Sequence, residues 1–321
     1  MILFLIQLTL VPLLSPLLVG VIRSMKARMQ SRIGASMFQP YLDLLKLFRK
    51  DEIISRDASW ISLAGPYIVF IISVLVPLGV PLLTVSAPTL SFPGLAAPLT
   101  LAPLGDFIVI VYLMALGAFF LALLGMDAGG GFGGFGASRE MMVAALTEGG
   151  LFFALLSAAL AGGSMTTFVI AGRVSELPLI SYTPLIIGFS AFFIALLAEN
   201  KRFPVDNPAT HLELTMIHEA LLLEYSGKRL ALLEWAGANN LFIFIALGAN
   251  LFFPWGIAAG ESVAPAALLI ALIALSGKAL IALGAIAFIE SVIAKLRIFR
   301  VPDLLFTSFV LGMIAVGIII A

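Results

Sequence analysis

The segment 199–226 holds a dense cluster of ionisable side chains, and long stretches on both sides of it are almost pure hydrocarbon. Seven acidic or basic residues and both histidines of the protein lie in this segment. They are Glu199, Lys201, Arg202, Asp206, His211, Glu213, His218, Glu219 and Glu224. Because ionisable groups are costly beside a bilayer, such a cluster predicts a functional site.

The spacing of these side chains favours proton transfer over metal binding. If residues 209–224 form one helix, His211 and His218 lie within about 20° of each other on its surface. No His-Glu-x-x-His pattern is present, and histidines seven residues apart suit one metal ion poorly. Histidine titrates near neutral pH, which suits a relay. The alternative is a polar amphipathic helix that faces a partner protein.

Glu140 and Glu148 lie in the apolar stretch 140–163, and about 80° separates them around a helix. Both could face a shared polar interior, although Glu140 follows Arg139 and could instead pair with it at the surface. Glu148 lies deeper, where an unpaired carboxyl is expected to be protonated. A protonatable carboxyl in hydrocarbon suits a proton relay. The alternative for Glu148 is a structural pair with an Arg or Lys.

Three further charged residues have mainly structural interpretations. Arg202 and Asp206 flank Phe203-Pro204, where proline restricts the residue before it. We expect the two side chains to pair across a fixed turn. Lys278 lies inside an apolar stretch, so a carboxylate on another span, such as Glu148, is its expected partner. Alternatively, its ammonium reaches the membrane interface.

The composition predicts an all-α integral membrane protein. The 321 residues are 61% hydrophobic and only 11% charged, whereas a soluble chain carries roughly 25% charged residues. We expect a single domain, residues 1–321, with eight transmembrane helices and short cytoplasmic amphipathic helices, because eight stretches can cross a layer of ~30 Å. They are about 2–22, 61–84, 104–126, 140–163, 179–198, 232–255, 264–290 and 303–321. The first stretch lacks a cleavage-site pattern, which favours a spanning helix over a signal peptide.

Lysine and arginine are distributed unevenly between the connections. Sixteen of the eighteen follow the first, third, fifth and seventh stretches. Because an excess of these residues marks the cytoplasmic side, we expect both termini outside and the ion-rich connections in the cytoplasm. Such a positive surface suits a partner protein or anionic lipid headgroups.

Two of the cytoplasmic connections have recognisable patterns. In residues 35–50, apolar and charged side chains alternate at helical spacing, which predicts a short helix in the interface plane or, alternatively, a solvated helix end. Residues 129–136 are mostly glycine and are expected to form a turn, since the Lys and Ser/Thr of a phosphate-binding loop are missing. The chain has no cysteine and therefore cannot hold a disulfide or a thiolate-ligated cluster or haem.

The motifs and their order resemble the eight-helix membrane subunit of respiratory complex I. That subunit connects the electron-transfer arm to the membrane arm and shapes the quinone chamber. The matching motifs are Arg32-Ile33-Gly34, Gln39-Pro40, Asp43, Lys46, Glu199-x-x-Arg202-x-Pro204-x-Asp206, Glu213-Leu214, Glu224-Tyr225-Ser226 and Arg297-Ile298-Phe299-Arg300-Val301-Pro302-Asp303. The resemblance covers nearly the whole chain.

Two details are similar to one branch, the membrane anchors of energy-converting NiFe hydrogenases, including formate hydrogenlyases. Ala209 and His211 occupy positions where quinone-handling members carry extra carboxylates. The Gly-rich segment is followed by Ser138-Arg139-Glu140-Met141, as in that branch. In such complexes the peripheral module reduces protons to hydrogen, and no quinone is needed.

The resemblance implies a docking and coupling subunit with no catalytic or metal-binding residues of its own. The candidate ion relay is Glu140, Glu148, Glu199, Glu213, Glu219, Glu224, Asp303, His211, His218 and Lys278. The candidate partner-docking residues are Arg32, Gln39, Asp43, Lys46, Arg202, Asp206, Arg297 and Arg300. The NiFe centre and iron–sulfur clusters are expected on a hydrogenase-like large subunit and an iron–sulfur small subunit at the cytoplasmic side. Antiporter-like subunits are expected beside the chain in the plasma membrane of a prokaryote, and no nucleic acid is expected.

Two other functions are compatible with the sequence. One is the quinone-chamber subunit of a complex I-like dehydrogenase, which a quinone-analogue inhibitor would distinguish. The other is a stand-alone ion transporter, which would not need the basic platform and would purify alone. Proton and sodium transport are both open at this stage.

Overall fold

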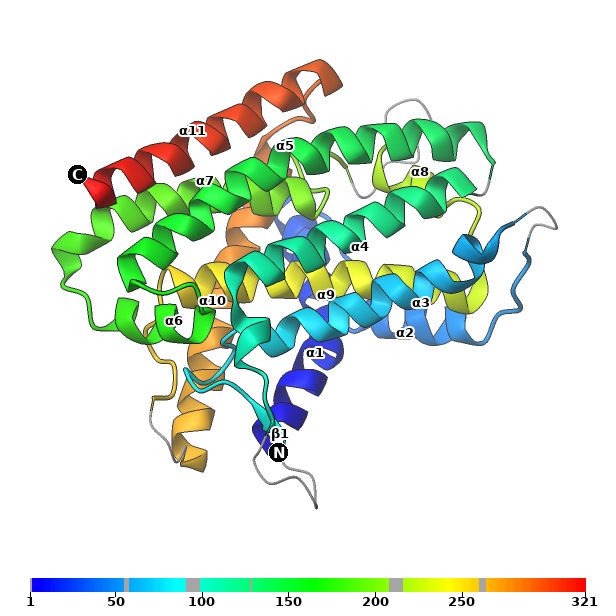
Figure 1. The fold of residues 1–321 in the computed structure, drawn as a ribbon. Coiled ribbons are helices and arrows are strands. Elements are labelled where there is room, and N and C mark those ends of the chain that lie inside the picture. The colour runs from blue at the N-terminus through cyan, green and yellow to red at the C-terminus, as the bar shows by residue number, and fades with distance from the viewer. Residues whose placement is uncertain (1, 55–57, 91–98, 128, 208–215, 260–263) are drawn as a thin grey trace.

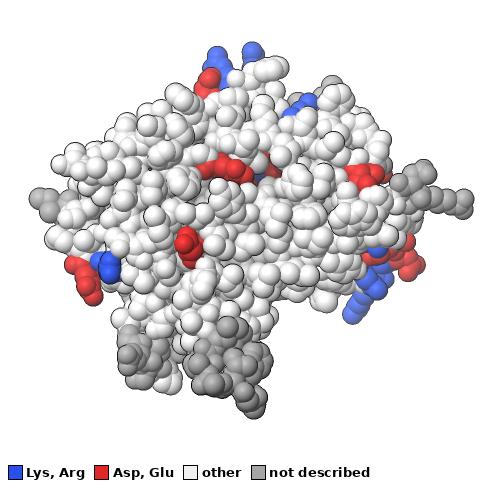
Figure 2. Space-filling view, in the orientation of Figure 1, with Lys and Arg blue, Asp and Glu red and all other residues white. Residues whose placement is uncertain are grey.

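The fold is a bundle of long helices, most of which run lengthwise beside one another while α1 and α10 cross them steeply (Figure 1). The structure is a computed structural model and describes residues 2–54, 58–90, 99–127, 129–207, 216–259 and 264–321. Seven helices of the described chain are long and apolar enough to cross a membrane. The face seen in Figure 2 is almost free of charged side chains apart from a few separate acidic patches and charges at its edges.

The long helices coincide with the stretches predicted from hydropathy, with shifted ends. Their bounds are α1 (Ile2–Met29), α3 (Trp60–Leu75), α4 (Phe107–Asp127), α5 (Gly131–Gly162), α7 (Thr183–Glu199), α9 (Gly227–Leu251), α10 (Pro265–Val292) and α11 (Val301–Ile320). The 3-10 helix η1 (Val76–Gly79) extends α3. The expected fifth span, α7, has 17 residues and is too short to count among the seven.

Short elements join the long helices. They are α2 (Gln39–Phe48), η2 (Ala102–Gly105), α6 (Thr167–Ser175), η3 (Leu179–Tyr182), α8 (His218–Leu222), η4 (Ile298–Arg300) and the paired strands β1 (Thr89–Leu90) and β2 (Leu99–Thr100). The helix expected within 35–50 is present as α2. The helix expected over 209–224 is described from residue 216 onward, where α8 accounts for five residues.

The Gly-rich segment is not a turn, which corrects the sequence-based expectation. Helix α5 begins at Gly131 and includes the glycines up to Gly136. Gly133 and Gly136 face close neighbours, since a Cβ on Gly133 would collide with the Gly125 carbonyl oxygen. Glycine is therefore used here for close helix packing, and the favourable contacts outweigh its low helix propensity.

Two buried asparagines on α9, Asn239 and Asn250, form hydrogen bonds to neighbouring segments of the bundle. Asn239 on α9 is fully buried, accepts a hydrogen bond from Ser15 Oγ (2.6 Å) and donates one to Ser73 Oγ (3.0 Å), so it joins α1, α9 and α3. Asn250 Nδ2 donates to the carbonyls of Pro81 (2.7 Å) and Leu82 (2.9 Å) after η1. Buried polar groups of this kind are costly unless hydrogen-bonded, so these contacts fix how the helices cross.

Candidate functional site

The connection after α7 carries Lys201 and Arg202, which form ion pairs with buried carboxylates of two other helices. It turns sharply at Lys201, whose φ is +51°, and Arg202 N donates to the Leu197 carbonyl (2.8 Å). This turn aims the side chains of Lys201 and Arg202 at different neighbours. Each finds a buried carboxylate on another helix, and the two carboxylates are far apart in sequence.

Lys201 pairs with Glu140 of α5. The distance from Lys201 Nζ to Glu140 Oε1 is 2.6 Å, and the carboxylate side chain is 2% exposed. Burial alone would lower the pKa of the Lys201 ammonium, but the carboxylates of Glu140 and Glu199 raise it above its usual value. The second oxygen, Glu140 Oε2, is buried and has no hydrogen-bond partner within the described chain. The alternative prediction that Glu140 pairs with Arg139 at the surface is therefore wrong. Arg139 donates a hydrogen bond to the Met216 carbonyl instead (3.1 Å).

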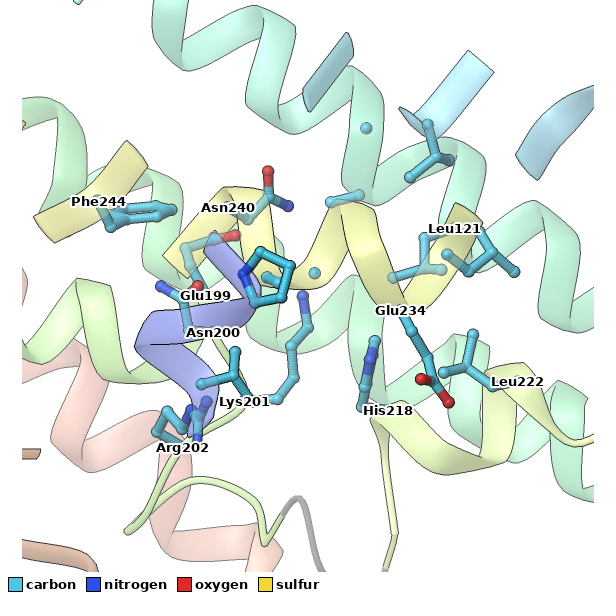
Figure 3. A pocket seen from close by; sticks show the side chains of 18 of the residues that line it. Leu121, Glu199, Asn200, Lys201, Arg202, His218, Leu222, Glu234, Asn240 and Phe244 are labelled. Atoms are coloured by element: carbon cyan, nitrogen blue, oxygen red, sulfur yellow. The ribbon is translucent and has the colours of Figure 1, made fainter. Parts of the chain in front are cut away.

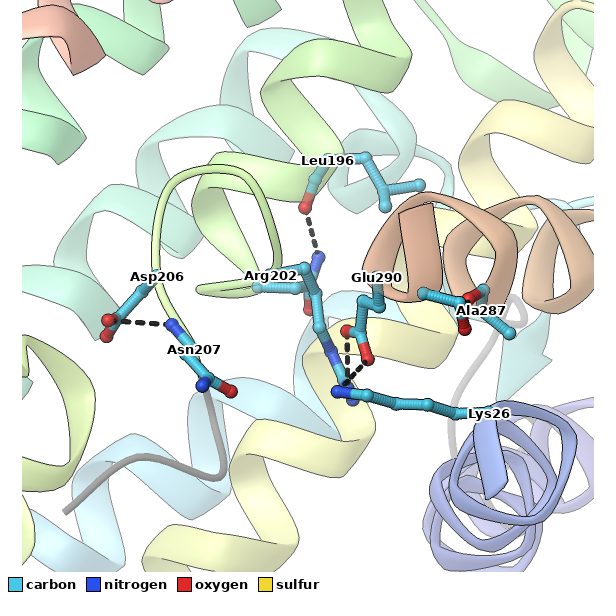
Figure 4. Close-up of polar contacts among 9 residues, drawn as sticks. Lys26, Leu196, Arg202, Asp206, Asn207, Ala287 and Glu290 are labelled. Atoms are coloured by element: carbon cyan, nitrogen blue, oxygen red, sulfur yellow. Dashed lines mark hydrogen bonds and ion pairs between the residues drawn. The ribbon is translucent and has the colours of Figure 1, made fainter. Parts of the chain in front are cut away.

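Arg202 pairs with Glu290, a carboxylate near the end of α10 that the sequence analysis did not select. Glu290 Oε1 lies 3.2 Å from Arg202 Nη1, and its Oε2 lies 3.2 Å from Lys26 Nζ of α1 (Figure 4). The Glu290 side chain is 1% exposed. Lys26 also lies 5.2 Å from the centre of the Phe203 ring. One carboxylate thus ties α1, α10 and the connection after α7 together.

Asp206 does not pair with Arg202, which corrects the expected turn pair. Its Oδ1 lies 2.5 Å from Lys295 Nζ. Its Oδ2 accepts hydrogen bonds from the backbone N–H groups of Ile217 (3.1 Å) and His218 (3.2 Å). Asp206 therefore holds the start of α8 and so positions the His218 ring.

A cavity of about 190 Å³ lies where these elements meet. Its polar wall consists of Arg23, Asp43, Glu199, Asn200, Lys201, Arg202, His218, Glu219, Glu234 and Asn240. Figure 3 shows how Lys201, His218 and Glu234 gather along this wall. Apolar side chains of α3, α4 and α9 also line the cavity, among them Val69, Ile72, Met114, Leu121 and Phe244.

His218 presents an ionisable ring to this cavity. Its Nδ1 is buried and has no hydrogen-bond partner in the described residues. Burial, reinforced by the positive charge of Lys201, lowers the pKa of His218 to about 4. The imidazole is therefore neutral at physiological pH and offers either a donor or an acceptor to a molecule in the cavity.

Two further carboxylates in the cavity wall, Glu199 and Glu234, interact electrostatically with charged neighbours. Glu199 lies close enough to Lys201, Glu140 and Glu148 for their charges to act on it. On the other side, the charges of Glu219, Arg23 and Asp43 act on Glu234 of α9. Sequence reasoning missed Glu234, which lies outside the motifs that carry the family resemblance. Its signal was a carboxylate just inside the predicted span 232–255.

Several predicted relay residues do not line this cavity. Glu148 is half-buried in a separate groove between α4 and α5, and Asp303 is exposed in the first turn of α11. Glu224 is exposed near the loop that precedes α5. Lys278 Nζ donates a hydrogen bond to Asn250 Oδ1 (3.0 Å). The prediction that Lys278 pairs with a carboxylate on another span, such as Glu148, is therefore wrong. His211 and Glu213 lie outside the described residues.

The predicted docking residues divide into a buried and an exposed set. Arg202 and Asp206 are tied into the ion pairs above. Arg32, Lys46, Arg297 and Arg300 are exposed. Asp43 accepts from Gln39 Nε2 (2.8 Å) and lies 3.8 Å from Arg23 Nη1 at the edge of the cavity. Across the described ranges, no group of three or more His, Asp or Glu side chains is arranged to hold a metal ion.

Long apolar helices around a cavity with ionisable walls define a multi-pass membrane protein whose polar site lies at the helix connections. The profile of the NADH dehydrogenase family matches residues 1–321, and the chain belongs to this family. It is a membrane subunit of the class found in complex I-like and hydrogenase complexes.

The similar proteins agree with this assignment. The chain is 30% identical to formate hydrogenlyase subunit 4 of Escherichia coli (strain K12) over 295 residues, which cover 92% of this chain and 91% of the relative. It is also 30% identical to hydrogenase-4 component C of the same strain over 307 residues, or 94% and 90% of the two chains. A subunit of the NADH-quinone oxidoreductase of Syntrophotalea carbinolica is 29% identical over 249 residues, or 72% and 69%.

A solved structure has the same fold. It is a chain of the membrane-bound sulfane sulfur reductase, an archaeal respiratory membrane complex, with a TM-score of 0.78. The alignment covers 98% of this chain and 97% of that chain at 21% identity. This likeness supports the helical fold, and the match to the family profile over residues 1–321 confirms the family that the sequence motifs resembled.

Proposed function

We propose that this chain docks a peripheral redox module and couples its electron transfer to ion movement through the cavity carboxylates. The observation that carries the proposal is the convergence of Glu199, Lys201 with Glu140, His218 and Glu234 on one buried site. Ionisable groups at such depth are costly and usually functional. The two 30% identical relatives are a subunit of formate hydrogenlyase and a component of hydrogenase-4, which favours a hydrogenase-type partner.

The pair between Lys201 and Glu140 is the proposed switch. Protonation of Glu199 would remove a negative charge from beside the Lys201 ammonium and weaken the electrostatic hold on that ammonium. A redox change in a docked module alters the charge near the cavity mouth, where Arg23 and Asp43 lie. Such a change would shift the proton occupancy of the carboxylates, because in a buried site charges interact strongly. When the charge of the module returns to its starting value, the carboxylates exchange protons again, and this exchange would drive the ion movement.

The remaining details of the assembly are part of the same proposal. The eighth crossing would be α7, whose 17 residues rise about 25 Å, so the layer must thin slightly around it. Both termini would face outward, with a hydrogenase-like large subunit and an iron–sulfur small subunit on the cytoplasmic side and antiporter-like subunits in the plasma membrane. The NiFe centre and iron–sulfur clusters would belong to those partners, and residues 1–321 would form one domain.

A quinone-chamber role is the second candidate. The apolar part of the cavity lining, with Val69, Met114 and Leu121, is of the kind expected for a hydrophobic ligand. The similarity to a component of NADH-quinone oxidoreductase also favours it. A quinone-analogue inhibitor separates the two candidates, because it would stop a quinone-linked reaction and leave hydrogen-linked ion movement unchanged.

The experiment that tests the first candidate has two parts. The complex is extracted in mild detergent and its subunits are identified; a nickel-bearing partner is expected, and a chain that purifies alone would contradict docking. Ion movement per hydrogen is then measured in vesicles with Glu234→Gln, a cavity carboxylate, and, as a control, Glu176→Gln, an exposed carboxylate after α6. Unchanged ion movement in Glu234→Gln would remove that residue from the path.

A further inference from the structure

Helix α2 lies against the middle of α1 and not at the end of it. The Tyr41 hydroxyl donates a hydrogen bond to the Leu13 carbonyl (2.5 Å). A Cβ on Gly20 would collide with the carbonyl of Met37. The backbone just before α2 therefore also packs closely against α1. Helix α1 continues about 13 Å beyond Gly20 to Met29. The contacts with α1 therefore place α2 at the depth of the apolar half of α1.

The outer face of α2 combines exposed leucines with cations. Leu42 is 57% exposed and Leu45 is 54% exposed. Lys46 follows Leu42 by four residues on the helix, and Arg49 and Lys50 come directly after its last residue, Phe48. These five side chains line one shallow groove. The opposite face is occupied, since Pro40 and Leu44 are buried.

The positive charge of this groove is not neutralised within the described chain. No ion pair involves Lys46, Arg49 or Lys50 among the residues that the structure describes. Arg23, in contrast, faces Asp43. The groove therefore has a net positive charge beside an apolar surface, and an occupant of complementary chemistry has an anionic group joined to hydrocarbon.

We propose that this groove, lined by Leu42, Leu45, Lys46, Arg49 and Lys50, binds an anionic phospholipid. The phosphate would contact the three cations, because basic side chains beside a membrane attract anionic headgroups. The acyl chain would cover the two leucines, as on other helices that lie in the membrane interface. The depth of α2 beside α1 favours lipid over a partner protein in the aqueous phase.

The test compares lipid binding to the intact complex in mild detergent by native mass spectrometry. Dioleoyl phosphatidylglycerol and dioleoyl phosphatidylcholine are titrated at low ionic strength. The variant Arg49→Gln/Lys50→Gln is expected to lose about 30-fold in phosphatidylglycerol affinity, since each cation near the surface contributes about fivefold. Phosphatidylcholine binding should hardly change. The matched control is Arg28→Gln/Arg300→Gln, which removes two exposed cations outside the groove, one at the end of α1 and one just before α11, and should leave both affinities unchanged.

A leucine variant and a competition with inorganic phosphate test the contribution of the acyl chain. Leu42→Ser/Leu45→Ser should weaken the binding of both lipids, whereas inorganic phosphate should compete poorly because it lacks a hydrocarbon tail. Unchanged phosphatidylglycerol affinity in Arg49→Gln/Lys50→Gln, or equal losses in the control, would overturn the proposal. Loss of a co-purifying subunit with unchanged lipid affinity would overturn it in favour of a protein partner.

Discussion

Replacing Glu290 with glutamine removes the anion that Lys26 and Arg202 share. Both contacts are 3.2 Å long, and the carboxylate side chain is 1% exposed while the cations are 22% and 11% exposed. Each contact has a Coulomb energy of about 5 kcal/mol at an effective dielectric constant of ~20. Desolvation offsets much of this energy, so the net cost of breaking such a buried arrangement is about 3–5 kcal/mol. Because the cations are partly hydrated and glutamine still accepts a hydrogen bond, we expect Glu290→Gln to cost about 3 kcal/mol.

The assay is thermal unfolding in detergent, followed by tryptophan fluorescence. The double variant Glu290→Gln/Lys26→Met should recover about 1–2 kcal/mol relative to additivity, because it removes one of the two stranded cations. Asp43→Asn is the matched control, since its pair with Arg23 is 3.8 Å long and the two side chains are 42% and 59% exposed. That control should cost less than about 1 kcal/mol. Equal midpoints for Glu290→Gln and wild type, or strict additivity in the double variant, would refute the reasoning.

Three other predictions follow from single positions. His218 has a pKa of about 4 in the fold against 6.5 when unfolded, so the unfolded chain binds the extra proton and stability should fall as pH drops from 6.5 to 4. The His218→Gln variant should lose that slope in unfolding midpoints measured against pH, and identical slopes would contradict the burial of the neutral ring. Gly20→Ala should cost about 1–3 kcal/mol by forcing Met37 away, whereas Gly277→Ala, where a Cβ meets nothing within 4 Å, should leave the midpoint unchanged or higher. Lys278→Met should destabilise the fold by about 1–3 kcal/mol, because it leaves the buried Asn250 Oδ1 without its donor while Asn250 Nδ2 keeps both carbonyl contacts; an unchanged midpoint would contradict this reasoning.

The positions of the long helices could be predicted from hydropathy, but their ends could not. A run of apolar residues marks the part of a helix that meets hydrocarbon, whereas α1 continues past residue 22 to Met29 through charged residues. Helix α5 begins nine residues before the predicted stretch because tight packing stabilises its glycines. The short helix α6 has no long apolar stretch of its own, so no hydropathy signal marked it.

The residue types of the site could be predicted, but the pairing could not. The density of ionisable side chains identified His218, and position in an apolar stretch identified Glu140; both lie in or beside the cavity. Glu290 and Lys26 are 264 residues apart, and no local pattern links them. Arg202 and Asp206 are neighbours in sequence, yet the sharp turn at Lys201 sends them to Glu290 and Lys295. Tertiary geometry decides which charge meets which.

The most direct test of the coupling proposal is the number of ions moved per hydrogen in vesicles that carry Glu199→Gln. Glu199 lies in the cavity wall beside Lys201 and Glu140, and the substitution keeps its shape while removing its charge and its proton. We predict that hydrogen turnover continues while ion movement falls at least tenfold. Full ion movement at an unchanged ratio, in a complex that retains all its subunits, would contradict the proposed coupling role of the cavity.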